Sequence, residues 1–127
     1  MILVDTSIWI GLLAGGRPKV AEEDLANFAT CGPVVQELLQ GLKPGPASDA
    51  FRQLLLAVPV LSDPVPLSLY LAAADIYRLG RRKGVTIRSS IDCLIAAIAI
   101  ENRVPVWHRD RDLSAIATYT ALEIFVP

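Results

Sequence analysis

The feature that most constrains the fold is an unbroken apolar run, ILV at residues 2–4, which stops at the carboxylate of Asp5. A half-exposed strand alternates apolar and polar residues, and this run does not alternate. It therefore predicts a short strand that is buried on both faces, as strands are in a parallel sheet covered by helices. Thr6 or Ser7 is expected to cap the helix that follows, and Pro18 to lie beyond its end.

Helical and strand patterns alternate along the rest of the chain. The predicted helices cover residues 6–13, 21–28, 33–41, 48–57, 66–84, 89–103 and 111–119, and the predicted strands cover residues 2–4, 29–31, 60–61, 104–108 and 121–126. Strands that alternate with helices are typical of an α/β protein with a mainly parallel sheet. No linker divides the chain, so we expect a single domain over residues 1–127.

Composition narrows the class of protein. Hydrophobic residues make up 53% of the chain and the mean hydropathy is +0.45, which suits one packed core and argues against disorder. The longest apolar run covers only residues 93–100, whereas a membrane helix needs about 18 to 20 residues. Cys31 and Cys93 are expected to be buried thiols in a reducing compartment. We therefore expect a cytoplasmic protein without a membrane segment.

The charged residues are unevenly distributed. The formal net charge is −1, but residues 1–77 carry four Lys/Arg against eight Asp/Glu, and residues 78–127 carry eight against five. The second part is therefore basic and suits a partner that carries phosphates. A solvated helix face accounts for the same charges equally well. The possible contacts to an RNA backbone are Arg81, Arg82, Lys83 and Arg88.

Several carboxylates stand where a structural role is not obvious. Asp5 follows the first strand, and Asp110 and Asp112 follow the strand predicted at 104–108. Glu37 and Asp92 lie in early turns of apolar helices. In an open parallel sheet, ligands bind outside the carboxyl ends of the strands. We therefore expect these side chains to converge in one cleft.

Clustered carboxylates raise each other's pKa unless cations neutralise them. Hard oxygen ligands select Mg²⁺ or Mn²⁺, and such ions activate water and offset charge in the hydrolysis of phosphate esters. Structural alternatives remain for individual residues. Ser89 and Asp92 fit a capping box, Asp110 or Asp112 fits a helix N-cap, and Thr6 and Ser7 suit either a cap or the site.

Four segments, ILVDTSIWI, VVQELLQG, SIDCLIAAIA and VWHRDRDLSAIA, occur in the order found in PIN-domain ribonucleases. The chain resembles this family over nearly its whole length, and in particular the VapC-type toxins of toxin–antitoxin modules. The resemblance implies a three-layer α/β/α sandwich around a parallel sheet. It also implies an endoribonuclease that depends on Mg²⁺ or Mn²⁺, with a VapB-type antitoxin, an RNA substrate and a second copy in a homodimer as partners.

The same resemblance implies roles for individual residues. Asp5, Glu37, Asp92 and Asp110 would form the catalytic acidic quartet, and the metal ligands would be Asp5, Asp92, Asp110 and Asp112. Thr6 would support them as the hydroxyl residue after the first aspartate. Leu113 follows Asp112, the second acid of the family's Asp-x-Asp ending, where many relatives have Phe. This departure leaves two alternatives, in which either Asp110 or Asp112 is the closer metal ligand.

Two other enzyme classes that place an aspartate after a strand are disfavoured. A haloacid-dehalogenase-like phosphatase needs Asp-x-Asp there, and Ser7 occupies the second acidic position. A receiver domain needs a lysine after a later strand, and Lys19, Lys43 and Lys83 follow no predicted strand. A PIN-fold RNA-processing nuclease without an antitoxin and a catalytically silent PIN binding module remain as alternatives.

Overall fold

The computed structural model describes residues 1–17 and 19–127, so Pro18 lies outside the described residues. Its sheet has the strand order β3-β2-β1-β4. The strands are β1 (Ile2–Val4), β2 (Phe28–Cys31), β3 (Val60–Leu61) and β4 (Val106–Trp107). Every neighbouring pair is parallel, which confirms the predicted sheet.

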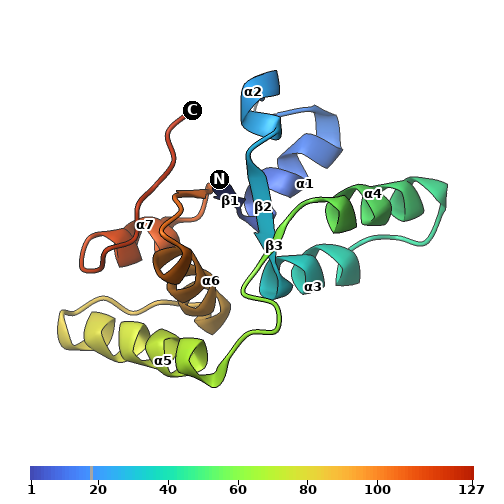
Figure 1. Cartoon of the computed structure of the whole chain (residues 1–127). Helices are drawn as coiled ribbons and strands as arrows, with labels where there is room; N and C mark the ends of the chain where they lie inside the picture. Colours follow the sequence, from blue (N-terminus) through green and yellow to red (C-terminus); the bar gives the residue numbers. More distant parts are fainter. Residues whose placement is uncertain (18) are drawn as a thin grey trace.

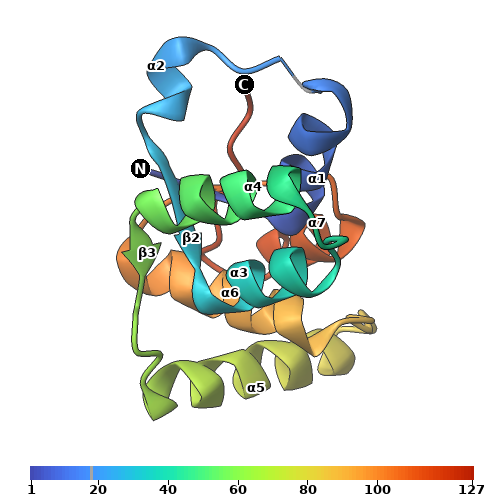
Figure 2. The same ribbon diagram turned by 90° about the vertical axis from the view of Figure 1, so that its right-hand side faces the viewer.

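Helices cover both faces of this sheet (Figure 1). They are α1 (Thr6–Gly15), α2 (Glu22–Leu25), α3 (Gly32–Gln40), α4 (Pro46–Ala57), α5 (Leu67–Arg82), α6 (Ser90–Asn102) and α7 (Arg111–Ala117). Helices α1, α3 and α4 lie on one side of the strands, and α6 and α7 lie on the other, with α5 packed against α6 (Figures 1 and 2). The three-layer α/β/α sandwich is therefore confirmed.

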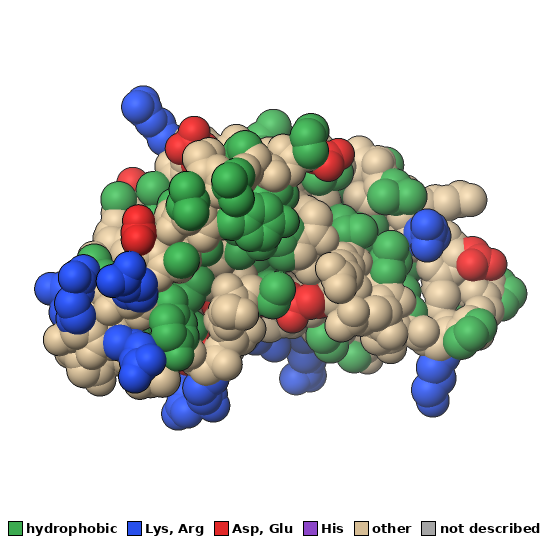
Figure 3. Space-filling model, turned by 90° about the horizontal axis from the view of Figure 1, so that it is seen from below, with side chains coloured by type: hydrophobic (Ala, Val, Ile, Leu, Met, Phe, Trp, Pro, Cys, Tyr) green, Lys and Arg blue, Asp and Glu red, His purple; other side chains and the backbone are tan. Residues whose placement is uncertain are grey.

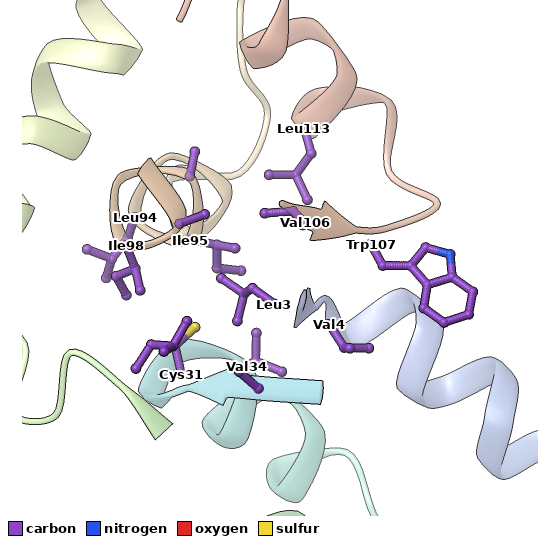
Figure 4. Packing of buried hydrophobic residues seen from close by; sticks show 14 of the residues in the cluster. Leu3, Val4, Cys31, Val34, Leu94, Ile95, Ile98, Val106, Trp107 and Leu113 are labelled. Carbon is purple, nitrogen blue, oxygen red and sulfur yellow. The ribbon is translucent and has the colours of Figure 1, made fainter. Parts of the chain in front are cut away.

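The apolar run at residues 2–4 is buried because β1 lies between two strands and between two helical layers. Leu3 and Val4 have no exposed surface. Ile95 and Ile98 of α6 pack toward β1 from one side, and Val34 of α3 packs from the other (Figure 4). Burial on both faces is the reason that this strand lacks the alternation of a half-exposed one.

The helix predicted at residues 21–28 is confirmed only for α2 (Glu22–Leu25), and its predicted end at Phe28 is wrong. The side-chain amide of Asn27 donates to the Glu23 carbonyl at 3.0 Å, and this hydrogen bond occupies a carbonyl at the end of the one-turn helix. Phe28 is instead the first residue of β2, where it pairs with Ile2. Pairing and burial of Phe28 in the sheet outweigh its helical spacing.

The strand predicted at residues 121–126 is also wrong. Ile124 forms one isolated parallel bridge with Val106, supported by the amide of Phe125, which donates to the Val106 carbonyl at 2.8 Å. The strand predicted at 104–108 is reduced to β4. Pro105 lacks an amide hydrogen and contributes only its carbonyl, which accepts from Leu3 at 2.9 Å.

None of the helices in the described parts of the chain is long and apolar enough to span a membrane. The single domain over residues 1–127 stays a prediction.

Candidate functional site

Asp5 directly follows β1 and is itself the N-cap of α1, so the prediction that Thr6 or Ser7 caps this helix is wrong. Its backbone is extended, and its Oδ2 accepts from the Ser7 amide at 3.3 Å and from Ser7 Oγ at 2.8 Å. The side chain reaches the amide two residues ahead, as N-cap aspartates do. Asp5 is buried, with 4% of its surface exposed, at the carboxyl end of the central strand.

Thr6 turns toward a different carboxylate. Its Oγ1 donates to Glu37 Oε1 at 3.1 Å, which joins α1 to α3. Burial raises the pKa of Glu37, the Thr6 hydrogen bond opposes this, and the negative charges of Asp5 and Asp110 raise the pKa further. Thr6 therefore lies in the acidic cluster that the sequence predicted.

Asp110 is both an N-cap and a member of this cluster. Its Oδ1 accepts from the Asp112 amide at 2.7 Å and begins α7. Its own amide donates to His108 Nδ1 at 2.9 Å. Burial lowers the pKa of His108, so the uncharged ring that can accept this bond is favoured. The structural alternative for Asp110 is thus correct and does not exclude a role in the site.

Asp112 is held by a residue from the loop between α5 and α6. Its Oδ2 accepts from the Arg88 amide at 3.1 Å, and its Oδ1 lies 3.6 Å from Arg88 Nε. Asp112 is buried, whereas the Arg88 side chain is 61% exposed. Arg88 is the predicted basic residue that the structure places directly beside the carboxylates.

Asp92 is the least satisfied of the acidic residues. Its Oδ2 is buried and has no hydrogen-bond partner among the described residues. Burial, followed by the charges of Asp110, Asp5, Asp112 and Glu37, raises the pKa of Asp92 to about 8. The capping-box alternative is wrong, because Ser89 caps α6 without a side-chain hydrogen bond in the described structure.

Three of the predicted carboxylates converge in the structure. One oxygen from each of Asp92, Asp110 and Asp112 lies within 4.8 Å of the others. Asp5 stands outside this trio, although its charge acts on both Asp92 and Glu37. Three oxygens in this arrangement, one carboxylate having a buried atom without a partner, fit a divalent cation with oxygen preference. These three residues could therefore hold a metal ion.

Two further surfaces of the molecule are distinctive. One is basic: Arg81 and Arg82 form the last turn of α5 and Lys83 caps it, and cationic side chains gather at one end of the face in Figure 3. Unlike Arg88, these three residues make no hydrogen bond or ion pair with the carboxylates in the described structure. The other is an apolar groove of about 730 Å³ between α1 and α3, with Glu37 in its wall. Its lining includes Ile10, Leu13, Leu38, Leu42 and Lys43.

Comparisons with known proteins agree with this architecture. A family model described as PIN domain matches residues 2–119. VapC ribonuclease Mb1587 of Mycobacterium bovis and ribonuclease VapC11 of Mycobacterium tuberculosis are each 36% identical over 130 residues, covering 97% of this chain and 96% of the relative. VapBC-1 from nontypeable Haemophilus influenzae has a TM-score of 0.77 at 22% identity, covering 98% of this chain and 97% of that one. VapBC2 from Rickettsia felis, bound to promoter DNA, has a TM-score of 0.75 at 17% identity and covers 98% of both chains. The two structures share the fold.

Proposed function

The chain belongs to the PIN-domain family of VapC ribonucleases, and on this premise we propose that it is a metal-dependent endoribonuclease that acts as the toxin of a toxin–antitoxin module. The observation that carries the proposal is the buried Asp92 oxygen without a partner, beside the carboxylates of Asp110 and Asp112. A carboxylate left in this state has a strongly raised pKa, and a bound cation supplies the missing partner.

The proposed metal ligands are Asp5, Asp92, Asp110 and Asp112, and the proposed ion is Mg²⁺ or Mn²⁺. When bound, such a cation activates water and offsets charge on phosphoryl oxygens. Arg88 neutralises part of the Asp112 charge, so Asp110 is the closer ligand of the adjacent pair in this proposal. Hard carboxylate oxygens favour these ions over softer metals.

Glu37 completes the proposed catalytic quartet of Asp5, Glu37, Asp92 and Asp110. Thr6 holds Glu37 Oε1, and the half-buried carboxylate faces the charges of Asp5 and Asp110. In this proposal Thr6 orients Glu37, and Glu37 Oε2 orients the attacking water at the edge of the cluster.

The proposed substrate is RNA, gripped through its phosphates. Arg88 projects an exposed guanidinium beside Asp112, where a scissile phosphate would lie. Arg81, Arg82 and Lys83 extend positive charge along the end of α5, so they suit phosphates farther along the strand. For this proposed activity we also propose a cytoplasmic location. Fractionation of cells that express a tagged chain tests that location.

The proposed antitoxin partner is a small VapB-type protein. The groove between α1 and α3 supports this, because exposed apolar side chains such as Ile10 and Leu13 lead to the carboxylate of Glu37. An antitoxin segment with apolar residues and one basic residue would be complementary to this groove, because its apolar side chains would pack on Ile10 and Leu13 and its basic side chain would pair with Glu37. Co-purification with the product of a neighbouring reading frame tests the proposal. Recovery of the chain alone would favour an RNA-processing nuclease without an antitoxin.

We also propose a homodimer. Helix α5 exposes Leu67, Tyr70 and Leu71, with exposed fractions of 72%, 50% and 60%, beside an apolar groove between α5 and α6. Figure 3 shows hydrophobic side chains on this face next to the basic end. An exposed apolar patch of this kind suits self-association. Sedimentation equilibrium tests it, and a monomer at micromolar concentration would contradict it.

Replacement of Asp5 by Asn tests the nuclease proposal with little structural change. Asn caps helices as well as Asp does, so Asp5→Asn keeps α1 capped while removing a charged ligand. We expect Mg²⁺-dependent cleavage of RNA to fall by at least about a hundredfold, since metal-site charge stabilisation is worth several kcal/mol. Asp75→Asn, on the exposed surface of α5, is the matched control and should cleave normally. Equal cleavage by the wild type, Asp5→Asn and Asp75→Asn, or cleavage that EDTA does not affect, would favour a different activity or the catalytically silent alternative.

A further inference from the structure

We propose that Ser7 is a positioning residue, which couples Asp5 to the loop of residues 108–110 and thereby fixes the two strand-end carboxylates Asp5 and Asp110 relative to each other. This inference rests on the proposed function. It concerns the preparation of the metal site, because Ser7 itself is not a proposed ligand.

The Ser7 hydroxyl has two partners that are far apart in sequence. Its Oγ donates to Asp5 Oδ2 at 2.8 Å and accepts from the Arg109 amide at 3.0 Å. A hydroxyl has one proton to donate. Donation to the Asp5 carboxylate therefore fixes the direction of that proton and leaves a lone pair for Arg109. The side chain thus joins segments that lie 102 residues apart.

The Ser7 link lies just beyond the paired ends of strands β1 and β4. Strands β1 and β4 are paired up to Val4 and Trp107, and the Asp5 amide makes a further bond to the Trp107 carbonyl at 2.9 Å. Beyond that point the chain turns into α1 on one side and into the 108–110 loop on the other. Ser7 continues the connection past the end of the sheet, at the residue immediately before Asp110.

The Asp110 side of the link is ordered by contacts of its own. The Asp110 amide donates to His108 Nδ1, and the Asp110 carboxylate caps α7. Those contacts fix Asp110 relative to its own loop and helix, whereas the Ser7 bond fixes that loop relative to Asp5. Loss of the hydroxyl removes the acceptor of the Arg109 amide and the shortest hydrogen bond to the buried Asp5 carboxylate, and with them the direct link between Asp5 and the 108–110 loop.

Ser68 provides a matched control within the same chain. Ser7 is the second residue of α1, and Ser68 is the second residue of α5. Ser68 is exposed, and the described structure gives its side chain no hydrogen bond. Ser68→Ala therefore reports the effect of replacing serine by alanine in the first turn of a helix, and Ser7→Ala reports this effect together with loss of the link.

The test is direct Mn²⁺ binding to the purified full chain, measured by the electron paramagnetic resonance signal of free Mn²⁺, well below the unfolding temperature. Ser7→Ala should weaken binding about tenfold, as loss of a residue that orients a metal ligand typically does. Ser7→Thr, which keeps the hydroxyl, should restore most of the affinity, and Ser68→Ala should bind as wild type does. Thermal unfolding in EDTA is recorded for each variant.

The outcomes separate this inference from the proposed function. If wild-type protein and Ser7→Ala bind Mn²⁺ equally, the positioning role is wrong while the metal site stands. The same holds if Ser7→Ala lowers only the unfolding temperature, because that is a purely structural effect. If wild-type protein binds no Mn²⁺, the proposed metal centre fails and the role of Ser7 toward it fails with it.

Discussion

Two adjacent hydroxyl side chains organise different carboxylates of the acidic cluster. Thr6 faces Glu37 on α3, and Ser7 faces Asp5 and the loop before α7. Neither caps α1, because Asp5 does so itself. A single turn of helix thus connects three separate segments around the site, which explains why a short polar pair follows the apolar strand.

Replacement of Thr6 by Val keeps the shape of the side chain and removes its hydrogen bond to Glu37. A bond to an ionised carboxylate is worth about 1.5–3 kcal/mol, so we expect about a tenfold or larger fall in kcat for RNA cleavage. The Thr6 bond lowers the pKa of Glu37, and its loss should move the acidic limb of the pH–rate profile to higher pH.

Thr6→Ser is the control for this variant, since it retains the hydroxyl and loses only a methyl group. It should keep both the wild-type kcat and the wild-type acidic limb. Identical pH–rate profiles for Thr6→Val and the wild type would show that Thr6 does not act through Glu37.

At the scale of elements, the sequence is most informative where burial and backbone preference agree. The run at residues 2–4 and the apolar helix after Ser89 are such segments, and both appear as predicted. The sheet order then brings Asp5 and Asp110 to one edge, so the carboxylate cluster was predictable from strand ends.

Other elements depend on contacts that local patterns do not encode. Phe28 has helical spacing in the sequence but belongs to β2, because its partner Ile2 lies 26 positions earlier. Residues 121–126 are apolar at every position except Glu123 and favour a strand by composition, yet only Ile124 bridges to Val106. The hydrogen bonds from the Arg88 amide to Asp112 and from the Arg109 amide to Ser7 likewise join distant segments. The sequence therefore indicated the residues of the site but not which of them contact one another.

Gly80 of α5 allows a close approach that any side chain would block. A Cβ atom at this position would lie 2.5 Å from Tyr119 Oη and 3.1 Å from the Val85 carbonyl oxygen. Tyr119 Oη donates to the Ile76 carbonyl at 3.1 Å, so the ring ties the segment after α7 to α5. The glycine therefore serves packing between elements and is not a local break in the helix.

Gly80→Ala should lower the free energy of unfolding by about 1–3 kcal/mol, as overpacking does, although alanine favours helices by about 1 kcal/mol. Gly15→Ala, at the end of α1 with no atom within 4 Å of its Cβ, is the control and should be neutral or slightly stabilising. Urea denaturation measures both. Stabilisation of both variants would mean that Tyr119 moves aside without cost.

At the scale of the whole molecule, the folded chain combines charges that the sequence keeps apart. Asp5 and Glu37 come from the acidic first part, whereas Asp92 and Asp110 come from the basic second part, and the sheet brings them together. The buried cluster therefore opposes folding when all its members are ionised. Stability should consequently depend on pH and on divalent cations, with Asp92 as the most affected group.

Asp92→Asn isolates this effect, because it removes one titrating carboxylate and leaves His108 and the other acids in place. The pKa of Asp92 rises from 3.8 to about 8 on folding, so between these values the folded state holds a proton that the unfolded state has lost. In EDTA, the unfolding free energy of the wild type should therefore fall relative to that of Asp92→Asn as pH rises from about 4 to about 8, by at most about 1.4 kcal/mol per pH unit.

Saturating Mn²⁺ should reverse the trend in the wild type, since the cation binds the deprotonated carboxylate, and should stabilise Asp92→Asn less. Urea denaturation at a series of pH values measures both differences. A wild-type minus variant difference that does not change with pH in EDTA would show that Asp92 ionises as readily in the folded protein as in the unfolded chain.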